Sequence, residues 1–297
     1  MSVTDLGGAL GNITRGSGER IDILSLNMCL SSMIEVISEV YRYVGFIVAT
    51  EADNAPLYVW PSEDVIQRLI ENPRVSPRIF TGWILDDYEP CYYEMNTPLS
   101  SLFNSLPYPS LHTVVIKTSL SVIDTSGVDK LIKAIDKFSN VLITGINEFK
   151  SMITEVRSVV RSFGRWSTKY HILVPVYENW FPLNIFSYSD YIDLYDFVHL
   201  LTKDYSRDDG LRNSSVEVMK SLKDVVMGLK KLPGDHSHGI SIYFPDSRSQ
   251  YNKPIWGYNL TLRYEDLGFS ENTRWDDLLH IYLLGNSVSI ERGVNLK

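Results

Sequence analysis

The sequence predicts an α/β fold with a mostly parallel sheet flanked by helices, and three neighbouring segments carry this prediction. Residues 20–26 form a short, largely apolar run rich in β-branched side chains, which is typical of a strand buried on both faces. Residues 31–43 place apolar side chains at helical spacing, and residues 46–49 form a second buried strand. A strand, a helix and a strand in this order make the βαβ unit that joins parallel strands.

Composition divides the chain into three parts. Residues 1–20 are rich in Gly, Ser and Thr, and we expect a loop-rich segment there with one or two helical turns. Residues 21–285 form the main domain, and residues 286–297 form a C-terminal tail. The sequence shows no internal repeat.

Periodicity and capping residues predict the remaining elements of the main domain. Loop-rich stretches are expected at 164–189 and 245–273, where Pro, Gly, Asn and Tyr are frequent. Strands are expected at 112–120 and 238–244. Helices are expected at 62–71, 76–88, 126–138, 141–163, 190–201, 214–229 and 275–284.

Charge and cysteine usage exclude several classes of function. The net charge is −8 without a basic cluster, which argues against nucleic acid as a partner. No apolar run is long enough to span a membrane, and no signal peptide is visible. The sequence does not assign the protein to a cellular compartment. The two cysteines, Cys29 and Cys91, cannot build a disulfide framework or a structural zinc site. We therefore predict no metal and no cofactor.

Cys29 follows the first predicted strand directly. Ligands of open parallel sheets bind at the carboxyl ends of the strands, which is where this thiol is expected. A helix capped by Ser31 or Ser32 would place amide groups near the sulfur, where they stabilise a thiolate and can bind an oxyanion. The alternative is a structural cysteine, because free cysteines are among the most buried residues.

Residues 21–37 resemble the segment around the catalytic cysteine of the clostripain family of cysteine peptidases. In that family an apolar strand ends in Asp-Ala-Cys-Leu, and the helix that follows contains Met and Glu-Val. The resemblance covers most of residues 20–285. Further similar blocks occur in the family's order at 48–51, 60–61, 120–124, 128–131, 191–197, 238–245 and 273–277.

The resemblance implies a caspase-like sheet that carries a Cys/His dyad. The thiolate of Cys29 would attack a peptide carbonyl, and an imidazole would protonate the departing amine. The family's histidine precedes its cysteine in a His-Gly motif, whereas all histidines of this chain follow Cys29. His238-Gly239 imitates the motif but lies in a block that is a structural strand in the family. The six histidines are His112, His171, His199, His236, His238 and His280.

The resemblance also places a substrate pocket beside the nucleophile, formed here by Asn27, Glu51, Asp53 and Trp60. The family has an acid two residues before the cysteine, where this chain has Asn27. A neutral amide cannot match the charge-assisted hydrogen bonds of a carboxylate to a guanidinium. We therefore predict no preference for Arg or Lys at the cleaved position. Residues 208–210 are expected to be a solvated turn rather than a calcium loop.

We expect the N-terminal strands of the family fold to be missing, so that residues 20–26 become an apolar edge strand. A light-chain-like polypeptide, the first 19 residues or a loop, or a second copy of the chain would then cover this edge. The first functional hypothesis is a cysteine endopeptidase that cleaves peptide or protein substrates with a histidine supplied from outside this chain. The alternatives are a catalytically inactive relative that acts as a binding or interaction module, and an unrelated α/β binding protein.

Overall fold

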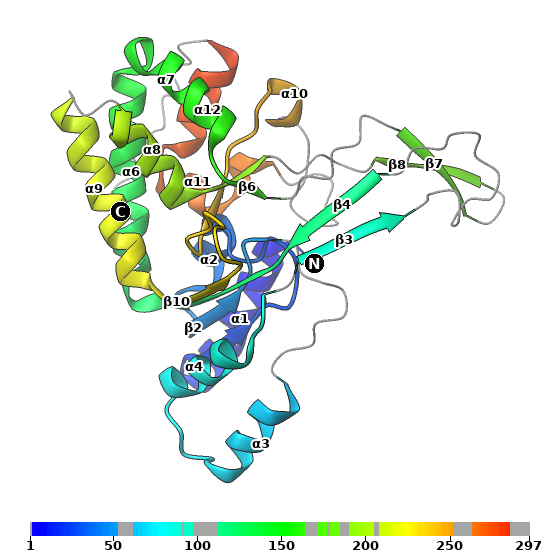
Figure 1. Ribbon diagram of the computed structural model, residues 1–297. Coiled ribbons are helices and arrows are strands. Elements are labelled where there is room, and N and C mark those ends of the chain that lie inside the picture. The colour runs from blue at the N-terminus through cyan, green and yellow to red at the C-terminus, as the bar shows by residue number, and fades with distance from the viewer. Residues whose placement is uncertain are drawn as a thin grey trace.

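The computed structural model describes residues 2–52, 62–90, 92–97, 112–163, 171–176, 179–184, 190–204, 208–251 and 263–285. A central sheet lies between two layers of helices, as the predicted α/β class requires (Figure 1). Within the described residues, no helix combines the length and the apolarity that crossing a membrane requires.

The central sheet has the strand order β1-β2-β5-β10. Strand β1 (Ile21–Ser25) pairs in parallel with β2 (Val44–Ala49) across the helix α2 (Ile34–Val40), which confirms the predicted βαβ unit. Strand β5 (Ser119–Asp124) runs antiparallel to both β2 and β10 (Val226–Lys231). The prediction of mostly parallel pairing is therefore wrong for the described strands, because an apolar run reveals a strand without its direction.

Strand β1 lies at the edge of the sheet, so its expected burial on both faces is not found. Asp22 and Ser25 are exposed, and the three apolar side chains of the strand are only partly buried. The Arg20 side chain, just before β1, donates hydrogen bonds to the Tyr41 and Val44 carbonyl oxygens and so ties the start of β1 to the start of β2. Among the described strands, β2 is the only neighbour of β1.

One face of the sheet carries the larger core. Buried side chains of α2 and β2 pack there against the long helices, with Phe138, Phe197 and Trp275 among the largest buried residues. The helices of this layer are α6 (Val128–Thr144), α7 (Ile146–Val159), α8 (Leu194–Asp204), α9 (Asp209–Val225), α11 (Gly268–Asn272) and α12 (Trp275–Leu284).

The opposite face is covered by α3 (Glu63–Glu71) and α4 (Pro77–Asp87), which Ser62 and Ser76 cap. Val48 and Val122 of the sheet pack against Ile84 of α4 in this smaller cluster. Both helices agree with the sequence prediction within a residue or two, because each begins at a serine that accepts a hydrogen bond from the third helical amide.

Three further sheets are found among the described strands. Strands β6 (Ser162–Phe163), β9 (Tyr191–Asp193) and β11 (Ser241–Tyr243) form a small antiparallel sheet in the order β11-β9-β6. The pairs β3–β4 (Tyr92–Thr97 and His112–Lys117) and β7–β8 (His171–Val176 and Asn179–Asn184) extend away from the helical layer (Figure 1).

Several predicted boundaries are wrong for a common reason. The strand expected at 112–120 is two strands, β4 and β5, which separate at Thr118. The helices expected at 190–201 and 214–229 each include a short strand, β9 before α8 and β10 after α9. The expected loops contain β7, β8, α10 (Arg248–Tyr251), a 3-10 turn at Tyr264–Asp266 and α11. Short apolar runs next to a helix fit both periodicities, so pattern alone cannot divide them.

The N-terminal segment is a helix, α1 (Val3–Ser17), rather than the loop-rich segment expected for residues 1–20. Ser2 and Asp5 form a capping box that starts it. Its glycines allow close packing on α2 and on the residues that follow it, because a Cβ at Gly7 would lie 2.7 Å from the Glu39 carbonyl oxygen and one at Gly11 would lie 3.1 Å from the Tyr43 ring. Glycines that serve helix packing were mistaken for loop residues.

Candidate functional site

Cys29 lies in a turn at the carboxyl end of β1, and its side chain is exposed. The residue after it, Leu30, has φ of +54°, in the left-handed region that only glycine adopts freely. Such strain in a non-glycine residue costs about 1–3 kcal/mol and gathers at functional sites. The thiol is thus presented by a constrained turn at the surface, which agrees with its predicted position.

The loop that follows β2 holds this turn. The Leu30 N–H donates to the Ala52 carbonyl oxygen (3.1 Å), and the Ser32 N–H donates to the Thr50 carbonyl oxygen (2.9 Å). The Ser31 hydroxyl accepts from the Thr50 N–H (3.1 Å) and donates to the Leu26 carbonyl oxygen (3.1 Å). The ends of the two parallel strands therefore form one hydrogen-bonded unit around Cys29.

The helix start differs from the prediction. Helix α2 begins at Ile34 with Met33 as its N-cap, four residues after Cys29, and no side chain caps it. Ser31 and Ser32 were expected as caps. Their hydroxyl groups instead donate to the carbonyl oxygens of Leu26 and Gly239. The prediction was that a serine-capped helix start next to the sulfur would stabilise a thiolate. The observed helix starts further along the chain and has no side-chain cap, so it does not support this prediction.

The expected pocket residues occupy different environments. Asn27 is exposed in the same turn, two residues before Cys29. Glu51 is 0% exposed, so its carboxyl group contacts no substrate in this conformation. Asp53 and Trp60, like the second cysteine, Cys91, lie outside the described residues.

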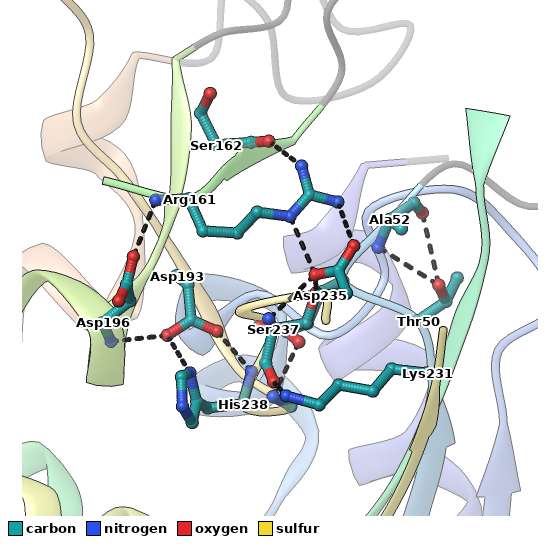
Figure 2. A network of polar contacts seen from close by, with 12 residues as sticks. Thr50, Ala52, Arg161, Ser162, Asp193, Asp196, Lys231, Asp235, Ser237 and His238 are labelled. Carbon is teal, nitrogen blue, oxygen red and sulfur yellow. Dashed lines mark hydrogen bonds and ion pairs between the residues drawn. The ribbon is translucent and has the colours of Figure 1, made fainter. Parts of the chain in front are cut away.

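A polar network lies where the small sheet meets the end of the β2 strand (Figure 2). Arg161 donates from Nε (3.0 Å) and Nη2 (3.1 Å) to the two carboxylate oxygens of Asp235. Asp235 also accepts from the N–H (2.9 Å) and the hydroxyl (2.5 Å) of Ser237. Burial is the largest single influence on the pKa of Asp235 and raises it, but the hydrogen bonds of Ser237 and the charge and hydrogen bonds of Arg161 together outweigh burial, so the pKa is lowered. This ion pair fixes the segment that leads to His238.

Asp193 anchors the next residue of that segment. It accepts hydrogen bonds from the backbone N–H of His238 (2.5 Å) and of Asp196 (2.6 Å), and the His238 Nδ1 lies 3.0 Å from its Oδ1 (Figure 2). The His238 ring stacks on Tyr195 at 4.4 Å between ring centroids, and its side chain is 32% exposed. Asp193 and Tyr195 thus hold the His238 ring, an arrangement typical of a structural histidine.

Glycine 239 connects this network to the Cys29 turn. Its N–H donates to Glu51 Oε2 (2.6 Å), and its carbonyl oxygen accepts from the Ser32 hydroxyl (2.5 Å). The Ser241 N–H adds a bond to the Ser32 carbonyl oxygen (3.0 Å). Sequence reasoning assigned no role to Asp193, Arg161 or Asp235, although the position of Asp193 in a largely apolar run was a usable signal.

The other described histidines lie elsewhere. His280 Nε2 is 2.8 Å from Glu265, and this contact is the main reason that the pKa of Glu265 is lowered to about 2. His199 and His236 are exposed. Within the described residues, no group of three or more His, Cys, Asp or Glu side chains is arranged to hold a metal ion.

An exposed thiol at the end of a parallel strand in an α/β sandwich defines the class of the site, a candidate cysteine-nucleophile centre. Comparison with known families places the protein within this class. The clostripain family's sequence profile matches residues 1–282. The chain therefore belongs to the clostripain family. No curated protein matches it significantly.

Solved structures give the same fold. A clostripain of Bacteroides thetaiotaomicron in complex with a peptide inhibitor matches with a TM-score of 0.52 and 13% identity, over 92% of this chain and 94% of that one. A cysteine protease of B. fragilis matches with a TM-score of 0.52 and 14% identity, over 93% and 94%.

The inactive zymogen of a C11 protease from Parabacteroides distasonis matches with a TM-score of 0.53 and 14% identity. This match covers 92% of the present chain but only 62% of the zymogen chain. At such identities the likeness establishes the fold, which is the caspase-like α/β fold expected from the sequence.

Proposed function

We propose that this protein is a cysteine endopeptidase of the clostripain family with Cys29 as its nucleophile. One observation carries the proposal: the only described cysteine is an exposed thiol in a strained turn at the carboxyl end of a parallel strand. Membership of the family supports the same chemistry, in which a thiolate attacks a peptide carbonyl. Asn27, exposed beside the thiol, would contact the substrate side chain that precedes the cleaved bond.

The histidine of the dyad comes from outside this chain in this proposal. His238 and His280 are each paired with a carboxylate, Asp193 and Glu265. The edge strand β1 offers backbone groups to a further strand on its outer side. A strand added there would end beside Cys29, so a light-chain-like polypeptide that brings a histidine fits this edge. A second copy of the chain pairing edge to edge is the competing occupant.

Alkylation of the thiol tests the nucleophile. When the chain is mixed with a polypeptide that supplies the histidine, Cys29 should react with iodoacetamide well below pH 8, and about tenfold faster than Cys91, because the thiolate is the reactive form. Mass spectrometry of the digested protein gives both rates. Cys29→Ser removes the fast reaction, whereas the matched variant Cys91→Ser leaves it unchanged.

Equal and slow alkylation of the two cysteines would instead support the alternative, a catalytically inactive relative that serves as a binding module. Peptide cleavage separates the two functions further. Mixing the chain with a polypeptide that supplies a strand and a His-Gly sequence should produce cleavage that depends on Cys29 and on that histidine. The cleaved peptides should show no preference for Arg or Lys before the scissile bond.

A further inference from the structure

The Gly239 peptide lies between the Cys29 turn and a buried carboxyl group. Both of its polar atoms bond to side chains: its N–H donates to Glu51 Oε2 (2.6 Å), and its carbonyl oxygen accepts from the Ser32 hydroxyl (2.5 Å). Ser32 is three residues after Cys29 and is 0% exposed. The backbone of this one residue thus joins the loop after β2 to the loop that presents the thiol.

The backbone at this position admits only glycine. Gly239 has φ of +104°, and a Cβ there would lie 2.8 Å from Val226 Cγ1 and 3.3 Å from the Ser121 hydroxyl. A side chain would therefore push the peptide away from both partners. The geometry keeps the N–H directed at Glu51 and the carbonyl oxygen directed at Ser32.

Asp193 holds His238, the residue before Gly239. Its carboxylate accepts from the backbone N–H groups of Asp196 and His238 and from the His238 ring. Glu51 is buried beside it, and Glu51 Oε1 has no hydrogen-bond partner among the described residues. The charged or titratable groups around the pair are Arg161, Asp196, Asp235, His238 and Lys231.

The electrostatics favour a proton on Glu51. Burial, followed by the negative charge of Asp193, raises the pKa of Glu51 well above its usual value, and the Gly239 N–H and Arg161 oppose this only in part. A protonated Glu51 can donate to Asp193 while it accepts from Gly239. Loss of the proton would leave two carboxylates facing each other in the interior, which is costly.

We propose that Glu51 is a positioning residue for the Cys29 turn, which it holds through the Gly239 peptide and the Ser32 hydroxyl. Its role is to keep the thiol presented in one geometry, and it touches no substrate. The inference rests on the proposed function in one respect only: the position of the thiol matters for catalysis if Cys29 is the nucleophile. The turn can be observed whether or not the protein cleaves peptides, so failure of one idea leaves the other testable.

Hydrogen exchange of the whole chain tests the proposal. In Glu51→Ala, the amides of Leu30 and Ser32 should exchange about tenfold faster, because losing one buried hydrogen bond weakens the local structure by that order. Glu51→Gln keeps an acceptor for Gly239 and a donor for Asp193, so it should restore the wild-type rates. Unchanged exchange at residues 26–33 in Glu51→Ala, or failure of the Gln variant to restore it, would overturn the proposal.

A second pair of variants covers the case in which Glu51→Ala does not fold. Ser32→Ala removes only the link to the Gly239 carbonyl oxygen and should speed exchange at residues 26–33 by about fivefold to tenfold. The matched control is Ser139→Ala, another buried serine whose hydroxyl donates to a backbone carbonyl, 2.8 Å away in α6. This control should leave residues 26–33 unchanged. Equal effects of both variants on the turn would contradict a specific connection through Gly239.

Discussion

Two glutamates near the Cys29 turn are completely buried, and the protein holds them in different ways. Glu35, on α2, accepts hydrogen bonds from the Tyr243 N–H and the Tyr264 hydroxyl, both at 2.9 Å. Glu51, after β2, accepts one from the Gly239 N–H and faces the carboxyl group of Asp193. The first joins two elements of the core, whereas the second joins the core to the turn that presents the thiol.

The difference teaches that burial alone does not define the role of an acid. Burial is the main reason that the pKa of Glu35 is raised to about 7 and that of Glu51 is raised well above its usual value. The partners of Glu35 are a backbone amide and a tyrosine of the same core. The partner of Glu51, the Gly239 N–H, belongs to a residue whose carbonyl oxygen accepts a hydrogen bond from the Ser32 hydroxyl. We therefore expect Glu35 to control global stability and Glu51 to control local order.

The largest effect should come from Glu35→Ala. This change leaves a cavity in the core and removes the acceptor of the Tyr243 N–H and the Tyr264 hydroxyl, which should lower the free energy of unfolding by about 3 kcal/mol. Urea denaturation measures it, with the exposed Glu19→Ala as a control that should stay within about 0.5 kcal/mol. A loss below about 1 kcal/mol would remove the contrast between the two glutamates.

The pH dependence of stability gives the next largest effect. Because folding raises the pKa of Glu35 from 4.5 to about 7, the folded state binds more protons than the unfolded chain between these values. The contribution of this group is complete below pH 4.5 and is lost as the pH rises through about 7. Between pH 5 and pH 7.5 the loss amounts to about 2 kcal/mol.

Glu35→Gln should abolish that loss, because the amide still accepts from both donors but cannot ionise. Urea denaturation of both proteins at the two pH values measures the difference. Glu51→Gln should change the slope in the same direction, since its pKa is also raised. Parallel pH profiles of wild type and Glu35→Gln would show that Glu35 is not held protonated.

A smaller effect should come from the helix that supports α2 from outside. Gly7→Ala would place a Cβ 2.7 Å from the Glu39 carbonyl oxygen, so α1 must move away from α2, at a cost of about 1–2 kcal/mol. Gly8 has open space around it, and Gly8→Ala should raise stability by up to about 1 kcal/mol. Thermal unfolding separates the two variants. Equal melting temperatures would mean that α1 does not support the helix that carries Glu35.

Local patterns predicted the parts of this protein that depend on nearby residues. The strand at Ile21–Ser25, the turn at Cys29 and the helices capped by Ser62 and Ser76 follow from sequence alone, because each depends on neighbours within a few positions. The direction of β5 and the helix at residues 3–17 do not, since they depend on contacts with distant segments. Glycine spacing in that helix reflects packing on α2, which no local rule reveals.

The candidate site divides in the same way. Cys29 could be located from its strand and from the family resemblance. The burial of Glu51 could not, because it results from Asp193 and Gly239, which lie 142 and 188 residues further along the chain. A carboxyl group next to an apolar strand is compatible with a pocket or with the interior, and only the tertiary contacts distinguish the two.

The left-handed backbone of Leu30 has a consequence for how this turn can change. A glycine at that position would remove about 1 kcal/mol of steric conflict, so a more relaxed turn is a single substitution away. Glycine would also widen the range of conformations available to the neighbouring sulfur. Lower backbone strain and a fixed position of the thiol are therefore opposing requirements on residue 30.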